Sequence, residues 1–335
     1  MKNPTTFFFQ LTNRCNMKCK HCFAIHNKQE MSNIVMERGI EYVCNKINET
    51  NENEYFVNFL GGEAGLYNQS LIKNCINKIK EKTNNKIVKF IYQSNLTYKL
   101  SDEHLEIFKM VDFINTSYDY QIRFQNNEQE IWENNIKVLQ ELGCDVGLTM
   151  VLTKPFIGHF TPQLLLEMIS RLNINTIEFN RLFNTLEGDT LETIRANNSD
   201  VNEWLYQLFL YVRKNKVTTN IKTFKCIEDS FQHNHYNDHC RTCCAENITI
   251  QPNGNVITCM LDTKLPIYNL ITKKEMNSIK HVCYQESLLP KSCNNCKYLK
   301  WCKGNCHHYI HDESGCPTPT KIYDYLIMVE EMIMG

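Results

Sequence analysis

The sequence predicts an α/β protein: a partial (β/α)6 barrel of the TIM type, followed by a smaller cysteine-rich domain. Three observations carry this prediction. Six apolar, strand-like runs alternate with amphipathic helical runs through the first 217 residues. Glycine or polar motifs directly follow the first four of these runs. Eleven of the 17 cysteines lie between Cys226 and Cys316, where the alternation has stopped. Strands that alternate with helices are typical of parallel βαβ units.

The predicted elements follow one another in a regular order. Ser32 and Ser101 are typical N-cap residues and mark two helix starts. We expect helices at 32–48, 69–82, 102–110, 127–142, 162–172 and 200–215. We expect strands at 5–12, 54–60, 86–95, 112–119, 144–153 and 174–183.

The motifs after the strands are expected to meet at one rim of the barrel. Right-handed crossovers bring the carboxyl ends of all parallel strands to the same edge, where barrel enzymes hold their chemistry. A cysteine-rich loop follows the first strand, Gly61-Gly62-Glu63 the second, and Ser94-Asn95 the third. Ser117 and Asp119 end the fourth.

The pattern changes near residue 218, and we place a domain boundary there. The stretch 249–259 predicts a hairpin with a Pro-Asn-Gly turn. The expected division is a barrel at 1–217, a cysteine-rich domain at 218–320 and a C-terminal helix at 321–335.

Composition narrows the class of protein. A formal net charge of -1 gives no basic excess of the kind that nucleic-acid binding needs. No apolar run is long enough to span a membrane, and the first residues do not resemble a signal peptide. We therefore expect a cytoplasmic protein. Because disulfides are rare in the reducing cytosol, its many cysteines favour metal binding.

The first cysteine group has the spacing C-x3-C-x2-C, formed by Cys15, Cys19 and Cys22. Soft thiolates suit iron–sulfur clusters or zinc. Three ligands on a [4Fe-4S] cluster would leave one iron open for an external chelator. The alternative is a zinc site completed by His21 or His26.

"CNMKCKHC" after the first strand, with "GGE" after the second, resembles the radical S-adenosylmethionine (SAM) superfamily. The resemblance implies that the three cysteines bind a [4Fe-4S] cluster whose open iron is chelated by SAM. An electron from the cluster would cleave SAM to a 5′-deoxyadenosyl radical, which abstracts a hydrogen atom from the substrate. The chain departs from the family in lacking the proline that usually follows this second motif.

The resemblance also implies a set of SAM-contacting residues. Glycines let the SAM methionyl group approach closely, and an acid accepts from its ammonium. The simpler alternatives are a turn, helix caps, and a salt bridge for the arginine. The implied residues are Gly61, Gly62, Glu63, Ser94, Asn95, Ser117, Asp119 and Arg181.

The C-terminal cysteines resemble the SPASM extension of radical SAM enzymes, which implies two auxiliary [4Fe-4S] clusters. The first would use Cys244, Cys259 and Cys306, with Cys240, Cys243 or the more distant Cys226 as a fourth ligand or an open iron in its place. The second would use Cys293, Cys296, Cys302 and Cys316.

Other interpretations of the cysteines remain open at this level. The C-terminal array is also compatible with zinc sites or a disulfide framework. Cys44, Cys75 and Cys144 fall in predicted helices and strands and are expected to be core residues. The His-rich segment 231–240 is expected to be a solvated loop.

The leading functional hypothesis is a peptide maturase that forms a thioether or carbon–carbon crosslink in a ribosomally made peptide. Since the barrel starts near Met1, we expect a separate leader-recognition protein or direct docking of the precursor. A flavodoxin or ferredoxin is the expected electron donor. One alternative is an anaerobic sulfatase maturase that oxidises Cys or Ser to formylglycine, with Asp262 as candidate base. Another is a non-catalytic iron–sulfur protein.

Overall fold

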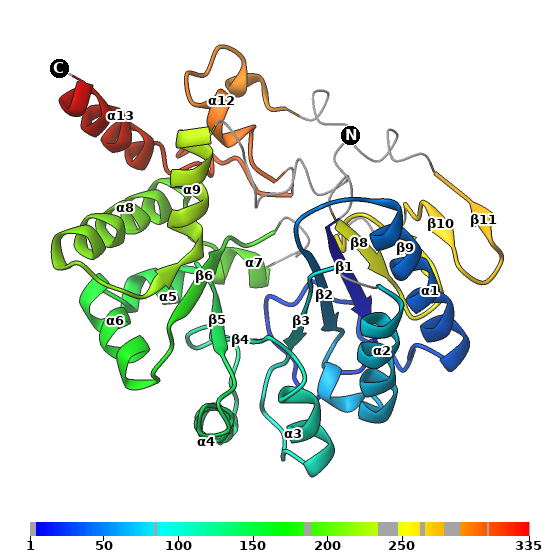
Figure 1. Cartoon of the computed structure of the whole chain (residues 1–335). Helices are drawn as coiled ribbons and strands as arrows, with labels where there is room; N and C mark the ends of the chain where they lie inside the picture. The colour runs from blue at the N-terminus through cyan, green and yellow to red at the C-terminus, as the bar shows by residue number, and fades with distance from the viewer. Residues whose placement is uncertain are drawn as a thin grey trace.

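The computed structural model describes residues 5–83, 86–183, 189–233, 247–261, 265–277, 289–306 and 308–334. Its strands form one continuous sheet in the order β11-β10-β9-β8-β1-β2-β3-β4-β5-β6-β7. The strands β1 to β6 curve through the middle of the molecule, with helices outside them (Figure 1). This is the partial barrel that the sequence predicts.

All six predicted barrel strands are present, and each pairs in parallel with the next. The strand side chains that pack against the outer helices, such as Phe9, Phe59 and Phe90, are fully buried. The strands are β1 (Thr6–Gln10), β2 (Tyr55–Leu60), β3 (Val88–Gln93), β4 (Phe113–Ser117), β5 (Val146–Val151) and β6 (Thr176–Asn180).

The six predicted helices are also present, and local caps explain several of their starts. The Ser32 hydroxyl accepts from the backbone N–H of Val35, and Ser101 forms a capping box with His104. The helices are α1 (Asn33–Glu49), α2 (Gln69–Lys82), α3 (Asp102–Phe108), α4 (Glu128–Glu141), α6 (Pro162–Arg171) and α8 (Asn198–Asn215).

Short helical segments that the periodicity did not predict lie between these elements. Such segments span too few turns to show a clear apolar stripe. They are η1 (Ala64–Leu66), α5 (Lys154–His159), α7 (Asp189–Ile194), η2 (Lys291–Cys293) and α12 (Leu299–Cys302).

The sheet continues beyond the boundary expected near residue 218. The strand β7 (Asn220–Ile221) pairs in parallel with β6, and α9 (Lys222–His233) packs against β6. At the other edge, β8 (Asn247–Ile250) pairs in parallel with β1. The cysteine-rich region therefore shares a backbone ladder with the barrel. A helix at 222–233 was not expected from the sequence.

The predicted hairpin is formed by β8 and β9 (Asn255–Ile257), and Gly254 has the left-handed φ of 82° that its turn needs. Two short strands, β10 (Tyr268–Asn269) and β11 (Lys274–Glu275), extend the sheet. The C-terminal helix α13 (Thr320–Met334) packs against α8 and α9 (Figure 1). None of the helices in the described ranges is both long and apolar enough to cross a membrane.

Candidate active site and cysteine sites

A cavity of about 200 Å³, here called the rim cavity, opens at the carboxyl ends of the barrel strands. It is the meeting point that the sequence predicts for the motifs after the strands. Every predicted SAM-contacting residue except Asp119 lines it. The predicted residues that line it are Cys15, Cys19, Cys22, Gly61, Gly62, Glu63, Ser94, Asn95, Ser117 and Arg181.

The three cysteines of the first loop are half-buried and present their thiols to the rim cavity. The backbone N–H of Met17 lies 3.4 Å from the Cys15 sulfur and donates to it. His26 Nε2 lies 3.1 Å from the Cys22 sulfur. Burial raises the pKa of Cys19 to about 11, although the positive charge of Arg123 opposes that rise. A thiolate here therefore needs a positively charged centre, such as iron, beside it.

Gly61 and Gly62 let the cysteine loop lie directly against the end of β2. A Cβ on Gly61 would lie 2.4 Å from the Thr12 carbonyl oxygen, and one on Gly62 would lie 2.4 Å from the Arg14 oxygen. The N–H of Gly62 donates to Thr12 O at 2.7 Å, which extends the β1–β2 ladder into the loop. The two glycines thus fix the position of the cysteine loop against the end of β2.

Glu63 is buried at the back of the rim cavity and accepts hydrogen bonds from the chain. Its carboxylate accepts from the backbone N–H of Gly65 at 2.7 Å, the Ser94 hydroxyl at 2.8 Å and the N–H of Asn95 at 2.6 Å. Burial raises its pKa above the usual range despite these donors. The side chain therefore ties the loop after β2 to the loop after β3.

Asn95 joins the loop after β3 to the cysteine loop. Its amide nitrogen lies 2.8 Å from Asn16 Oδ1 and 3.8 Å from the Cys15 sulfur. Asn16 in turn donates to the Thr97 hydroxyl at 2.9 Å. An amide donor beside a cysteine sulfur is one of the features that tune an iron–sulfur cluster.

Asp119 lies beneath the rim cavity, outside its lining, and forms a buried ion cluster. Its carboxylate lies 2.6 Å from Arg123 Nε and 3.2 Å from His21 Nε2, and it accepts from the N–H of Val151. Burial alone would raise the pKa of Asp119, but Arg123 and His21 hold it well below its usual range.

Arg123 also lines the rim cavity, although the sequence does not predict it there. Its guanidinium is held by Asp119 and interacts electrostatically with Cys19 and Cys22. The only sequence signal is its spacing of four residues from Asp119, which is common on protein surfaces. Arg123 therefore joins Glu63 and Arg181 as a charged residue in the lining of the rim cavity, and Asp119 positions it there.

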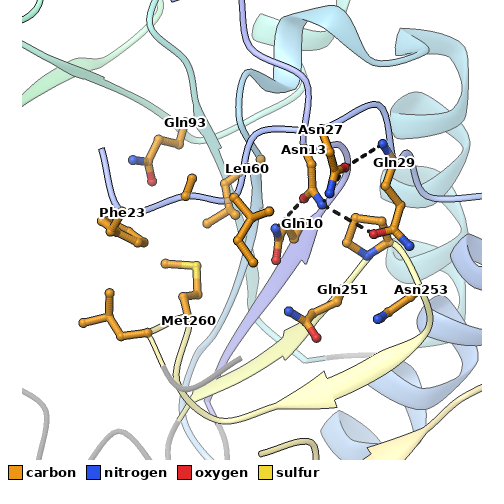
Figure 2. A pocket seen from close by; sticks show the side chains of 15 residues that line it. Gln10, Asn13, Phe23, Asn27, Gln29, Leu60, Gln93, Gln251, Asn253 and Met260 are labelled. Atoms are coloured by element: carbon orange, nitrogen blue, oxygen red, sulfur yellow. Dashed lines mark hydrogen bonds between the residues drawn. The ribbon is translucent and has the colours of Figure 1, made fainter. Parts of the chain in front are cut away.

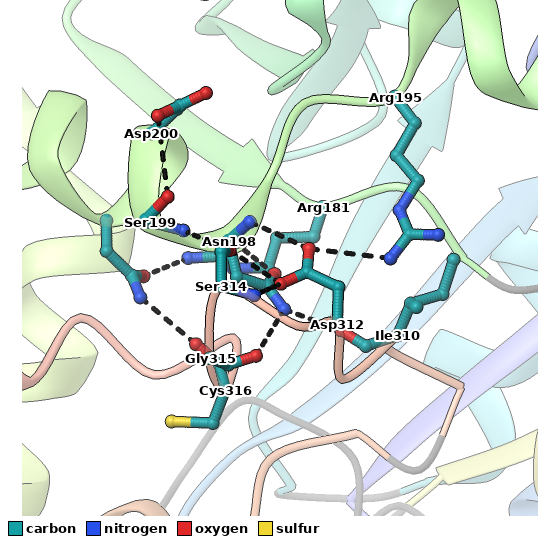
Figure 3. Close-up of polar contacts among 11 residues, drawn as sticks. Arg181, Arg195, Asn198, Ser199, Asp200, Ile310, Asp312, Ser314, Gly315 and Cys316 are labelled. Carbon is teal, nitrogen blue, oxygen red and sulfur yellow. Dashed lines mark hydrogen bonds and ion pairs between the residues drawn. The ribbon is translucent and has the colours of Figure 1, made fainter.

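Arg181 connects the end of β6 to the C-terminal cysteine region (Figure 3). Its guanidinium donates to the side-chain oxygens of Asn198 and Asn202 on α8. Asn198 Nδ2 donates to the carbonyls of Ile310 and Gly315 at 2.8 and 2.9 Å, and Asn202 Nδ2 donates to the Cys316 carbonyl at 3.0 Å. Arg181 thus lines the rim cavity and also supports the loop that carries Cys316.

A second cavity, of about 290 Å³, brings together the four cysteines predicted for the second auxiliary cluster. The turn after α12 exposes a backbone donor to it: Gly304 has a φ of 78°, and its N–H lies 3.4 Å from the Cys302 sulfur. The four thiols in its lining are those of Cys293, Cys296, Cys302 and Cys316.

The structure describes only some of the residues predicted for the first auxiliary cluster. Cys259 and Cys306 are both buried. Cys226 lies on α9 and lines a small cavity with Asn305. The other predicted residues of this region, together with most of the segment 231–240, lie outside the described residues: Cys240, Cys243, Cys244 and Asp262.

The cysteines that the sequence predicts as core residues lie in or against the hydrophobic core: Cys44 and Cys75 are buried and Cys144 is half-buried. Among the described residues, no three His, Cys, Asp or Glu side chains are placed to hold a single metal ion. A [4Fe-4S] cluster makes a different demand, because each thiolate binds a separate iron. Three thiols spread around one cavity fit that demand.

Comparison with known proteins agrees with this arrangement. Residues 5–140 match the family model described as a 4Fe-4S single cluster domain. This match covers β1 through most of α4 and confirms the prediction of an iron–sulfur cluster in the barrel region. No curated protein matches the sequence.

Solved structures extend the likeness over the whole fold. The anaerobic sulfatase-maturating enzyme anSMEcpe with bound AdoMet aligns over 98% of this chain and 100% of its own, with a TM-score of 0.78 and 16% identity. Its complex with AdoMet and the Kp18Cys peptide aligns over 96% and 95%, with a TM-score of 0.77 and 15% identity.

Streptococcus suis SuiB bound to precursor peptide SuiA aligns over 94% of this chain and 76% of its own, with a TM-score of 0.62 and 16% identity. At such low identities the likeness concerns the fold. The chain therefore has the fold of radical SAM enzymes with a SPASM extension, as the sequence predicts.

Proposed function

We propose that the chain is a radical SAM enzyme that modifies a residue of a peptide substrate, forming a thioether or carbon–carbon crosslink. The observation that carries the proposal is the rim cavity, which collects three thiols, a close-packed glycine pair and polar side chains from successive strand ends. Cys15, Cys19 and Cys22 would hold the [4Fe-4S] cluster. When bound there, cluster and SAM would supply a 5′-deoxyadenosyl radical that takes a hydrogen atom from the substrate.

The chain's own residues have separable tasks in this proposal. Gly61 and Gly62 hold the cysteine loop against the sheet, and Asn95 donates toward Cys15. Arg123 places a positive charge beside Cys19 and Cys22. The four cysteines of the second cavity would hold one auxiliary cluster, and Cys259 and Cys306 would contribute to another.

Formylglycine formation is a second candidate, favoured by a specific observation. The likeness to anSMEcpe spans both chains almost completely, whereas 76% of SuiB is covered. That reaction needs a carboxylate base near the target residue. Asp262 is the candidate base in the sequence.

A peptide substrate is supported by solved complexes of similar fold, in which anSMEcpe and SuiB are bound to peptides. We propose a ribosomally made precursor as the partner, recognised directly or through a separate leader-binding protein. A flavodoxin or ferredoxin would supply the electron.

The direct test is anaerobic 5′-deoxyadenosine formation from SAM, with dithionite as reductant. The wild-type chain is expected to form it, and a Cys15/Cys19/Cys22→Ala variant is expected to form none. Cys144→Ala, at a cysteine outside both cavities, is the matched control. Product from the triple variant at the wild-type rate would refute the proposal.

The peptide products then distinguish the two candidate reactions. A crosslink removes two hydrogen atoms and creates no aldehyde, whereas formylglycine carries an aldehyde that reacts with hydrazines. A hydrazine-reactive product would overturn the crosslink in favour of formylglycine.

A further inference from the structure

A third cavity, of about 270 Å³, adjoins the rim cavity and is here called the carboxamide pocket. Figure 2 shows its lining. The two cavities share Phe23, Ala24, Gly61 and Gln93. A molecule in the carboxamide pocket would therefore extend to the place where the three cysteine thiols gather.

The chemistry of this pocket is unusual for a protein surface. Seven of its lining side chains are carboxamides, and no described lining residue is charged. The remaining walls are mostly apolar, including Phe23 and Met260 (Figure 2). The seven carboxamides are those of Gln10, Asn13, Asn27, Gln29, Gln93, Gln251 and Asn253.

Part of this carboxamide set is a fixed scaffold. Asn13 accepts from Gln10 Nε2 at 2.8 Å and donates to Asn27 Oδ1 at 3.2 Å. Asn27 Oδ1 also accepts from the backbone N–H of Gln29 at 2.8 Å. These bonds fix Asn13 and orient the Gln10 amide so that its oxygen remains available.

Three glutamines supply hydrogen-bonding groups that the protein does not use. Gln10 ends β1, Gln93 ends β3, and Gln251 follows β8. Among the described residues, the side chains of Gln93 and Gln251 and the amide oxygen of Gln10 have no hydrogen-bond partner. Gln251 has 8% of its surface exposed and lines the pocket, so its amide remains open to the pocket. A carboxamide without a protein partner satisfies its hydrogen-bonding groups with water or with a bound ligand.

We propose that the carboxamide pocket binds an uncharged, hydrogen-bonding side chain of the peptide substrate: Asn, Gln, Ser or Thr. An amide or hydroxyl can both donate to and accept from the three glutamines. A charged side chain would lose its hydration and find no opposite charge in the described lining. Its aliphatic part would contact the apolar walls.

This inference rests on the proposed function and adds the substrate class to it. The bound side chain would anchor the peptide beside the rim cavity, so that a neighbouring residue reaches the site of hydrogen abstraction. Selectivity for neutral polar anchors follows because a site built from hydrogen-bonding groups discriminates strongly against partners that leave them unpaired.

The test is selection from a library of random peptides by the full chain, reconstituted anaerobically and saturated with SAM. The bound peptides are expected to be enriched in Asn, Gln, Ser or Thr at one position. In Gln251→Glu, the new carboxylate is expected to shift that preference about tenfold toward Lys and Arg. Gln10→Glu, on a neighbouring strand, should give the same shift and guards against misfolding of either variant.

Gln163→Glu is the matched control, because Gln163 is exposed on α6 and bonds Glu167 outside the pocket. It should keep the wild-type preference. A charged anchor in the wild type, no enrichment at all, or an unchanged preference in both pocket variants would overturn the inference. Formation of 5′-deoxyadenosine by the wild type is measured separately, so failure of the radical function is distinguishable from failure of the anchor.

Discussion

At the scale of single residues, the rim cavity depends on two buried carboxylates that do different things. Glu63 accepts hydrogen bonds from backbone and hydroxyl donors, whereas Asp119 pairs with the Arg123 guanidinium and the His21 imidazole. Both were singled out in the sequence because they follow strands. Their separate roles depend on which loops fold over them, and spacing alone does not reveal that.

Glu63→Gln is expected to weaken the join between the loops after β2 and β3. The amide nitrogen of glutamine would face an N–H or hydroxyl donor in place of an acceptor. We expect a loss of about 1–3 kcal/mol in the free energy of unfolding, measured by urea denaturation under anaerobic conditions. Glu41→Gln, on the exposed face of α1, is the control. Equal stability of the two variants would argue against this role.

Asp119→Asn is expected to destabilise the protein by about 3–5 kcal/mol at neutral pH, since it leaves the guanidinium of Arg123, which is 13% exposed beside the rim cavity, without its charged partner. The pKa of Asp119 is lowered in the folded state. Its stabilisation is therefore complete above the ordinary carboxyl pKa of about 3.9 and is lost as the pH falls toward the folded pKa.

Urea denaturation of the wild type and of Asp119→Asn across the acid range tests this pH dependence of stability. The difference in stability should narrow as the pH falls below about pH 4. A difference that did not narrow there would contradict the ion cluster described here.

At the scale of elements, the decisive contact lies between the cysteine loop and the end of β2. The sequence predicts that both belong to one rim, because both follow parallel strands. It does not predict that the glycine pair faces the backbone of Thr12 and Arg14, since that contact depends on the β1–β2 register.

Gly61→Ala and Gly62→Ala are each expected to displace the cysteine loop, because the added Cβ would overlap a carbonyl oxygen. The measurement is iron bound per chain after anaerobic reconstitution, which should fall by about four, the content of one cluster. Gly158→Ala on α5 is the control, since its Cβ would meet no atom within 4 Å. Full iron content in the first two variants would show that the loop tolerates the displacement.

Asn198→Ala tests the support of the Cys316 loop. The Asn198 amide donates hydrogen bonds to the carbonyls of Ile310 and Gly315. Its removal should therefore loosen the loop that carries Cys316, one of the predicted cluster ligands. We expect the iron content to fall while 5′-deoxyadenosine formation persists. Asn197→Ala is the control, because the neighbouring Asn197 makes no side-chain cap bond. Unchanged iron in Asn198→Ala would exclude this supporting role.

At the scale of the whole molecule, the barrel was predictable and the way it joins the cysteine-rich region was not. Alternating periodicities indicate the strands β1 to β6, and caps such as Ser32 and Ser101 mark helix starts. The pairing of β8 with β1 links residues more than 200 positions apart, and no local pattern reports it. Arg181 likewise acquires its partner Asn198 on α8 only through tertiary structure.

The proposed function requires one cluster site in the barrel and two in the C-terminal region. Iron per chain after anaerobic reconstitution tests this requirement most directly, in wild type and in the Cys15/Cys19/Cys22→Ala variant. We expect about 12 irons in the wild type and about 8 in the variant. About 4 irons in the wild type, falling to none in the variant, would contradict the C-terminal clusters.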